Sequence, residues 1–252
     1  FSGCFVVASG GLADKFGRMR MTTLGLGLSI VGSAMLVVAQ GPGLFLAGRV
    51  LQGLSAACIM PATLALIKTW YEGRARQRAV SFWVIGSWGG SGLCSFVGGA
   101  IATGLGWRWI FVFSIAVALL ALFLLRGTPE SRSASASQNK LDVGGLLSLI
   151  VGLVLVNLFI SKGHGWGWAS PLSLIMLAGA LIAGAVFIRS GLRKGEAALI
   201  DFALFRNRAY GAAVLSNFLL NGAIGTMMIA SIWLQQGHHL TPLESGMMTL
   251  GY

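Results

Sequence analysis

The sequence predicts an all-α, polytopic transmembrane helical bundle, and three observations support this fold class. Hydrophobic residues make up 56% of the 252 positions, with a mean hydropathy of +0.80. Charged residues make up only 10%, against about 25% in a soluble domain, which excludes soluble globular enzymes, disordered tails and collagen-like chains. The apolar residues also form runs of about 20 positions, the length of a spanning helix, instead of the alternation expected of a β-barrel.

The apolar runs predict the membrane-spanning helices in chain order. Residues 1–13 form about half of a span, and a further run starts near Pro242. The complete spans between them are expected at residues 21–39, 44–66, 79–103, 109–125, 143–161, 171–188 and 210–234. The chain begins without Met, and both of its ends lie inside apolar runs. We therefore expect a partial chain of a longer protein.

The loops between these spans alternate in charge. Four loops hold 15 of the 18 Lys and Arg residues, whereas the loops on the opposite side hold two. The basic loops cover residues 14–20, 68–78, 126–142 and 189–208. Because cytoplasmic loops of membrane proteins are enriched in Lys and Arg, we place these loops in the cytoplasm. The net charge of +11 then reflects orientation in the lipid bilayer, and no nucleic-acid partner is expected.

The first cytoplasmic turn carries the sequence GGLADKFGRMR at residues 10–20. Gly10 and Gly17 allow two helix ends to meet in a tight loop, while Asp14 can accept backbone hydrogen bonds or pair with Arg18. Spacing alone supports an ordinary basic turn equally well. The segment resembles motif A of the major facilitator superfamily, a gating motif. In that family, the Asp and Arg of the motif hold the two transporter halves together in the outward-facing state.

Arg49 lies inside the second complete span, where an Arg costs about 2.5–3.5 kcal/mol on insertion scales. We therefore expect it to face a polar interior with a partner, and Gln52 lies about one turn further along the same face. The alternative is an Arg near a helix end whose side chain extends to the membrane surface. Residues 49–57, RVLQGLSAA, resemble motif B of the drug:proton antiporters, in which the Arg is linked to proton coupling.

The third complete span is rich in small residues, which let helices pack backbone to backbone. The candidate interface residues are Gly86, Gly90, Cys94, Ser95, Gly98 and Gly99. The region resembles motif C of the antiporters, although Cys94 and Ser95 replace the usual Gly-Pro. Loss of the proline removes an expected helix kink.

The resemblance extends over the whole chain, to the quinolone and multidrug exporters of the 14-helix drug:proton antiporter family. It implies the major facilitator fold, a multi-pass location in a bacterial plasma membrane, and export by alternating access. No cofactor is implied, because the proton gradient supplies the energy. The implied partners are protons, small amphipathic drug-like substrates and the remaining half of the chain.

The same resemblance divides the chain into five parts. The Ser-rich segment at 127–142 is the clearest linker. The parts are 1–126, the N-terminal half from helix 2 to helix 6 with helix 1 missing; 127–142, a cytoplasmic linker; 143–188, two extra central helices; 189–209, a cytoplasmic loop; and 210–252, the start of the C-terminal half, which stops early in helix 10.

Five further side chains are candidates for the substrate cavity. Asn217 and Asn221 are four residues apart on one helix face, and amides in lipid need partners. Trp83 and Trp88 can stack on aromatic, cationic drugs, and Met227 suits an adaptable wall. For each of these residues, ordinary packing or interhelical hydrogen bonding is at least as good an interpretation.

The remaining features exclude other chemistry and leave alternatives open. No phosphate-binding loop, catalytic triad or metal-ligand set is visible, so the protein is not expected to be an enzyme. All seven acidic residues fall in loops or at helix ends, and Glu244 is the nearest candidate for a proton acceptor. Two alternatives remain: a transporter of a metabolite such as a sugar or amino acid, and a non-transporting membrane protein, either a sensor or an inactive truncated fragment.

Overall fold

The computed structural model describes residues 2–132, 142–195, 198–200 and 202–237, together with residues 241, 244, 247 and 248. This part of the chain is helical throughout and contains no strand. The elements are α1 (Ser2–Phe16), α2 (Arg18–Val38), α3 (Pro42–Trp70), α4 (Gly73–Gly104), α5 (Arg108–Leu124), α6 (Val143–Trp166), α7 (Pro171–Lys194), the short 3-10 helix η2 (Phe202–Arg206) and α8 (Arg208–Gly237). The prediction of an all-α fold is confirmed.

Five of the described helices, namely α2, α3, α4, α6 and α7, are long and apolar enough to cross a membrane. The apolar α5 is shorter, at 17 residues. Most helices extend beyond the predicted spans, because a helix continues after its apolar part leaves the lipid. Only Gly17 separates α1 from α2, and only Tyr71 and Glu72 separate α3 from α4.

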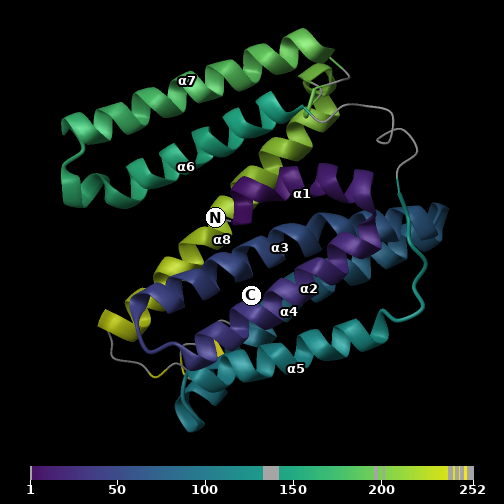
Figure 1. The fold of residues 1–252 in the computed structure, drawn as a ribbon, viewed down its shortest axis with the longest axis vertical. Coiled ribbons are helices and arrows are strands. Elements are labelled where there is room, and N and C mark those ends of the chain that lie inside the picture. Colours follow the sequence, from purple (N-terminus) through teal and green to yellow (C-terminus); the bar gives the residue numbers. More distant parts are fainter. Residues whose placement is uncertain are drawn as a thin grey trace.

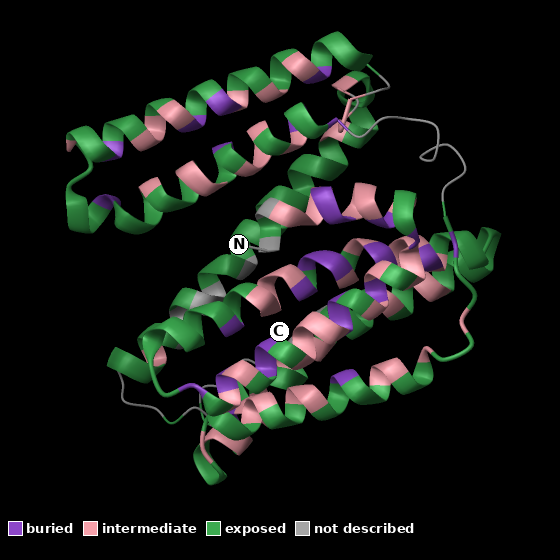
Figure 2. Cartoon of the chain, in the orientation of Figure 1, coloured by how far each residue is buried: buried purple, intermediate pink, exposed green. Residues whose placement is uncertain are grey.

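Helices α1 to α5 pack into one bundle, in which α2 contacts α3 and α5, and α1 contacts α3 (Figure 1). Helices α6 and α7 form a separate antiparallel pair beside α1 (Figure 1). Helix α8 follows η2 and contacts it. Buried positions gather on α1, α2 and α3, whereas α4 and α8 are largely exposed (Figure 2).

The bundle is held together through small residues. A Cβ atom added to Gly32 would lie 2.9 Å from the carbonyl oxygen of Gly48, and one added to Gly48 would lie 2.9 Å from that of Gly32. The two backbones therefore touch where α2 crosses α3. In lipid, apolar burial does not drive helices together, so close backbone packing takes its place.

The loops alternate between the two ends of this bundle, as the charge pattern predicts. The turn at Gly17, the end of α3 and the start of the linker meet at one end, where Arg18 contacts Thr69 and Ser131. At the other end, Arg108 Nη2 donates to the carbonyl oxygen of Ala39 over 3.0 Å. We call the first of these ends the cytoplasmic end, because it carries the basic loops.

Asp142 anchors the cytoplasmic end of the α6–α7 pair. Its Oδ1 accepts a hydrogen bond from the backbone N–H of Gly145 over 2.8 Å and one from Lys194 Nζ over 2.5 Å, while its Oδ2 accepts from the N–H of Leu199 over 3.4 Å. Burial raises the pKa of this carboxyl, but the hydrogen bonds outweigh burial and lower the pKa below the ordinary value of 3.8. One carboxylate thus joins the start of α6, the end of α7 and the loop that follows.

The Asp142→Ala substitution is expected to destabilise the α6–α7 pair by about 1–3 kcal/mol, because it removes both a helix cap and an ion pair. Thermal unfolding of the purified full-length protein measures this as a lower Tm. The stabilisation is present at neutral pH and is lost only as the pH falls below 3.8, since a lowered pKa favours the carboxylate in the folded state.

The matched control for that experiment is Glu72→Ala. Glu72 is also an acidic residue at a helix N-cap, but its side chain makes no capping hydrogen bond. Its removal is expected to leave Tm unchanged. An equal fall in Tm for both variants would contradict the anchoring role of Asp142.

Candidate functional site

The turn between α1 and α2 depends on the conformation of Gly17. Its φ of +124° is one that residues with side chains rarely adopt. A Cβ atom at this position would also lie 2.6 Å from the carboxyl carbon of Glu130. The position therefore requires glycine for two reasons, its backbone conformation and the close approach of the linker.

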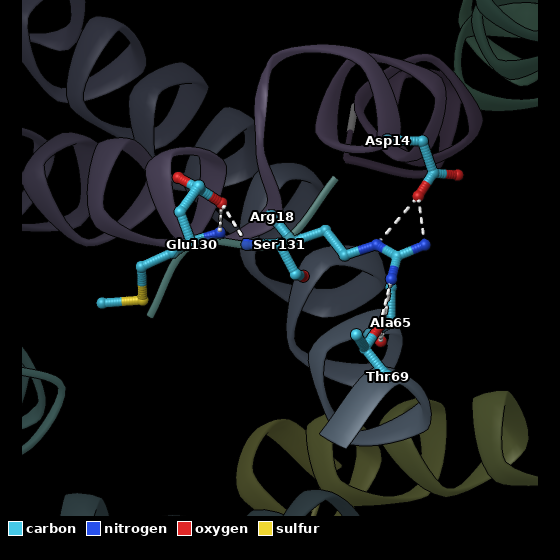
Figure 3. Close-up of polar contacts among 7 residues, drawn as sticks. Asp14, Arg18, Ala65, Thr69, Glu130 and Ser131 are labelled. Atoms are coloured by element: carbon cyan, nitrogen blue, oxygen red, sulfur yellow. Dashed lines mark hydrogen bonds and ion pairs between the residues drawn. The ribbon is translucent and has the colours of Figure 1, made fainter. Parts of the chain in front are cut away.

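Asp14 and Arg18 pair across this turn. Arg18 Nε and Nη2 donate to Asp14 Oδ1 over 2.9 and 2.7 Å, and the Arg18 side chain is only 16% exposed. Its Nη1 also donates to the hydroxyl of Thr69 and to the carbonyl oxygen of Ala65, the latter over 3.4 Å (Figure 3). Because Ala65 and Thr69 lie on α3, a single guanidinium joins α1, α2 and α3.

Glu130 caps α2 from the linker. Its Oε1 accepts from the backbone N–H of Met19 over 2.9 Å, and its Oε2 accepts from that of Arg20 over 3.1 Å. The N–H of Arg18 in turn donates to the carbonyl oxygen of Ser131 over 3.0 Å (Figure 3). A carboxylate at a helix N-terminus satisfies free N–H groups and interacts favourably with the helix dipole. The linker is therefore fixed to the turn at Gly17.

The Glu130 contact was missed by sequence reasoning, which assigned the residue only to the linker at 127–142. One signal could have indicated it. The N-cap of α2 is Gly17, which has no side chain to accept from the first N–H groups of the helix. An acidic residue supplied from another segment can do so.

The Gly17→Ala substitution is expected to lower Tm by several degrees, because it adds backbone strain of about 1–2 kcal/mol and forces Glu130 away from α2. The matched control is Gly127→Ala. Gly127 also has a positive φ, +85°, but a Cβ there would meet nothing within 4 Å. Thermal unfolding of the full-length protein compares the two variants, and equal shifts would show that the contact with Glu130 adds nothing.

Arg49 starts a chain of polar side chains that crosses three helices. Its Nη1 donates to Gln52 Oε1 over 3.0 Å, and Gln52 Nε2 donates to Ser33 Oγ over 3.1 Å. Ser33, which is fully buried on α2, then donates to Ser114 Oγ on α5 over 3.4 Å. Sequence reasoning named Arg49 and Gln52 but missed the two serines, because a single Ser in an apolar span carries no distinguishing signal.

Arg49 lies on the exposed surface of the described part of the bundle. It is seven residues after the first residue of α3, Pro42, which corresponds to about 10 Å along the helix axis. No ion pair joins it to a carboxylate among the residues that the structure describes.

Gln52 and Trp83 line a common cavity of about 390 Å³ between α2, α3 and α4. Trp83 Nε1 donates to Thr63 Oγ1 over 3.2 Å, which joins α4 to α3. The cavity is bordered by apolar and hydroxyl side chains, among them Ser29, Ser55, Ile59, Met60 and Ser87. Its size falls within the usual range of small-molecule sites, about 300–1,000 Å³.

Part of the glycine-rich face of α4 is uncovered within the described part of the chain, although Gly99 is buried. Cβ atoms at Gly86, Gly90 and Gly98 would meet no atom within 4 Å. Cys94 is a free, exposed thiol. The backbone oxygen of Gly99 accepts a hydrogen bond from the hydroxyl of Thr103 within the helix. Ser95 also has an interaction partner. The backbone contact between two glycines lies instead between Gly32 of α2 and Gly48 of α3.

Two of the candidates on α8, Asn217 and Asn221, bond to each other. Asn221 Nδ2 donates to the Oδ1 and the backbone oxygen of Asn217, each over 2.8 Å, and both side chains are exposed. Trp88 lies in α4 and Met227 in α8, but their side chains fall outside the described residues. The assignment of these four residues to a cavity remains a prediction.

Glu244 is engaged in a local contact. Its Oε2 accepts from the hydroxyl and the N–H of Thr241, each over 2.8 Å, and its own N–H donates back to that hydroxyl over 3.3 Å. This is the pattern of a helix capping box. The hydrogen bonds from Thr241 lower the pKa of Glu244. The role of Glu244 as a proton acceptor remains a prediction.

The chain matches a known protein family and several curated proteins over its whole length. The model of the Major Facilitator Superfamily matches residues 1–252. Similar curated proteins are the quinolone resistance protein NorB from Staphylococcus aureus strains MRSA252, JH9 and Newman, each 51% identical over 252 residues. The match covers 100% of this chain and 54% of each relative. The chain thus spans about half the length of the curated relatives it matches.

Proposed function

Because this chain belongs to the major facilitator superfamily, we propose that the full-length protein is a secondary transporter that exports amphipathic drugs, quinolones among them, in exchange for protons. The observation that carries the proposal is the polar chain from Arg49 to Ser114. It crosses three helices of the bundle, and its member Gln52 lines a cavity of drug size. The 51% identity to proteins named for quinolone resistance supports the choice of substrate class.

In this proposal, Arg49 supplies a fixed positive charge that polarises the cavity. An intramembrane Arg is costly in lipid, and such residues commonly face a water-filled pathway. Gln52 accepts from the guanidinium and is itself held in place by its hydrogen bond to Ser33. Protons and drug then bind alternately, as the transporter halves rock around the cavity.

The motif A turn acts as the cytoplasmic gate. Arg18 and Glu130 fix α1, α2, α3 and the linker to one another, so that these elements move together as a rigid body. The uncovered glycine face of α4, which includes Gly86 and Gly90, slides against helices of the remaining half of the protein. In this scheme, residues 1–126 belong to the N-terminal half, residues 143–188 form the extra central pair, and residues 210–252 begin the second half.

The proposal is tested by expressing the full-length gene in a bacterial strain that lacks its own drug exporters. Cells loaded with ethidium are expected to release the dye when energised, and a protonophore is expected to stop the release. Uptake of a sugar or amino acid that tracks expression, without dye release, would instead favour a metabolite transporter. Release that persists with the protonophore would contradict proton coupling.

A further inference from the structure

A second cavity, of about 580 Å³, lies at the cytoplasmic end of the bundle between the end of α3 and the start of the linker. We call it the cytoplasmic pocket, and the residues that define it are Ile67, Trp70, Tyr71, Arg126, Thr128 and Pro129. None of these residues belongs to the polar chain that runs from Arg49 to Ser114. The volume is that of a site for a drug-sized molecule.

The cavity lined by Gln52 and Trp83, which we call the central cavity, lies along the same face of α3 as the cytoplasmic pocket. Thr63 lines both of them. From Thr63, the walls continue towards Trp70 in one direction and towards Gln52 in the other, at the three- and four-residue spacing of one helix face. The 18 residues between these two ends correspond to about 27 Å of helix. The two cavities therefore adjoin at Thr63, along one face of α3.

The chemistry of the pocket fits a flat aromatic molecule that carries a negative charge. Trp70 and Tyr71 are large aromatic side chains left 50% and 47% exposed. Arg126 is the one cation in the wall, and no carboxylate among the described residues pairs with it. The guanidinium lies 5.6 Å from the ring of Phe123. Such a group binds carboxylates through paired hydrogen bonds, while aromatic faces stack on flat rings.

The walls of the cytoplasmic pocket are also next to residues that contact the turn at Gly17. On one side, Thr69 accepts from Arg18 immediately before Trp70. On the other side, Glu130 caps α2 immediately after Pro129. A ligand held between α3 and the linker therefore lies between two contacts that fix the cytoplasmic gate.

We propose that the cytoplasmic pocket is a first subsite for planar aromatic carboxylates, the chemical class to which quinolones belong, before they pass along α3 to the central cavity. The proposal rests on the drug-export function proposed above. Arg126 binds the carboxylate of the substrate, and Trp70 and Tyr71 stack on its ring system. Substrates without a carboxylate bypass the Arg126 contact.

The test measures export kinetics of the full-length protein for three compounds: norfloxacin, its decarboxylated analogue and ethidium. Arg126→Gln is expected to raise the KM for norfloxacin about tenfold, the size of a charged hydrogen bond lost, with kcat little changed. The KM values for the analogue and for ethidium are expected to stay as in the wild type. Arg126→Lys should restore part of the norfloxacin affinity, because it keeps the charge without the paired donors.

The matched control is Arg132→Gln, which removes an exposed cation from the same linker outside the pocket wall. It should leave all three KM values unchanged. An unchanged norfloxacin KM in Arg126→Gln, or an equal rise for all three compounds, would overturn the subsite. Wild-type export of ethidium without norfloxacin would overturn the subsite alone, whereas export of no compound would overturn the proposed function as well.

Discussion

The Arg49→Ala substitution in the full-length protein is expected to reduce proton-driven drug efflux by about 10- to 100-fold or more, the effect of losing a charged hydrogen-bonding group. It removes the first member of the polar chain and leaves Gln52 Oε1 without the donor it has in the structure. Efflux of ethidium from energised cells measures the effect. The amount of protein in the membrane fraction should match that of the wild type.

Arg49→Lys is the matched control, because it retains the positive charge but not the planar guanidinium. We expect it to keep part of the efflux activity, since the charge remains on the same face of α3. Normal efflux by a well-expressed Arg49→Ala protein would remove Arg49 from the mechanism. It would also favour the interpretation that the side chain simply extends to the membrane surface.

The second large effect is expected for Asp14→Asn, which should lower the efflux rate about tenfold or more. The substitution keeps the shape of the side chain but removes the charge that accepts two hydrogen bonds from Arg18. The largely buried guanidinium of Arg18 then loses its carboxylate partner. This loss weakens its hydrogen bonds to Ala65 and Thr69 on α3. The rate of dye release at saturating dye measures the effect on gating.

Arg20→Gln tests whether any charge in the turn would matter equally. Arg20 lies two residues after Arg18, but its side chain is 70% exposed and its Nε is 3.8 Å from Glu130 Oε2. Exposed pairs of this kind contribute little, so the efflux rate should stay close to that of the wild type. An equal loss in Arg20→Gln and Asp14→Asn would contradict a specific role for the Asp14–Arg18 pair.

The fold could be predicted from the sequence because lipid imposes a strong length requirement on apolar runs. The same signal locates the apolar part of each helix but not its ends. Helix α3, for example, continues to Trp70 through polar residues that the hydropathy pattern assigns to a loop. The tight turn at Gly17 was predicted correctly, since its glycine and its charges are local in the sequence. The assignment of Gly10 to the same turn was wrong, because Gly10 lies inside α1.

Contacts between distant segments could not be predicted in this way. Glu130 reaches a turn 111 residues away in the chain, and no local pattern encodes such a distance. The glycine spacing in α4 identifies a surface that can pack closely but does not identify the partner. The observed backbone contact, between Gly32 and Gly48, comes from glycines that no motif singled out.

The central claim is that drug export is coupled to proton movement through the cavity next to Arg49. The most direct measurement uses the purified full-length protein in liposomes that contain a pH-sensitive dye. When a pH gradient drives norfloxacin transport, proton movement should begin with drug addition, and it should be absent in Arg49→Ala liposomes. Drug transport that proceeds at the same rate without proton movement, or proton movement that is unchanged in Arg49→Ala, would contradict the account.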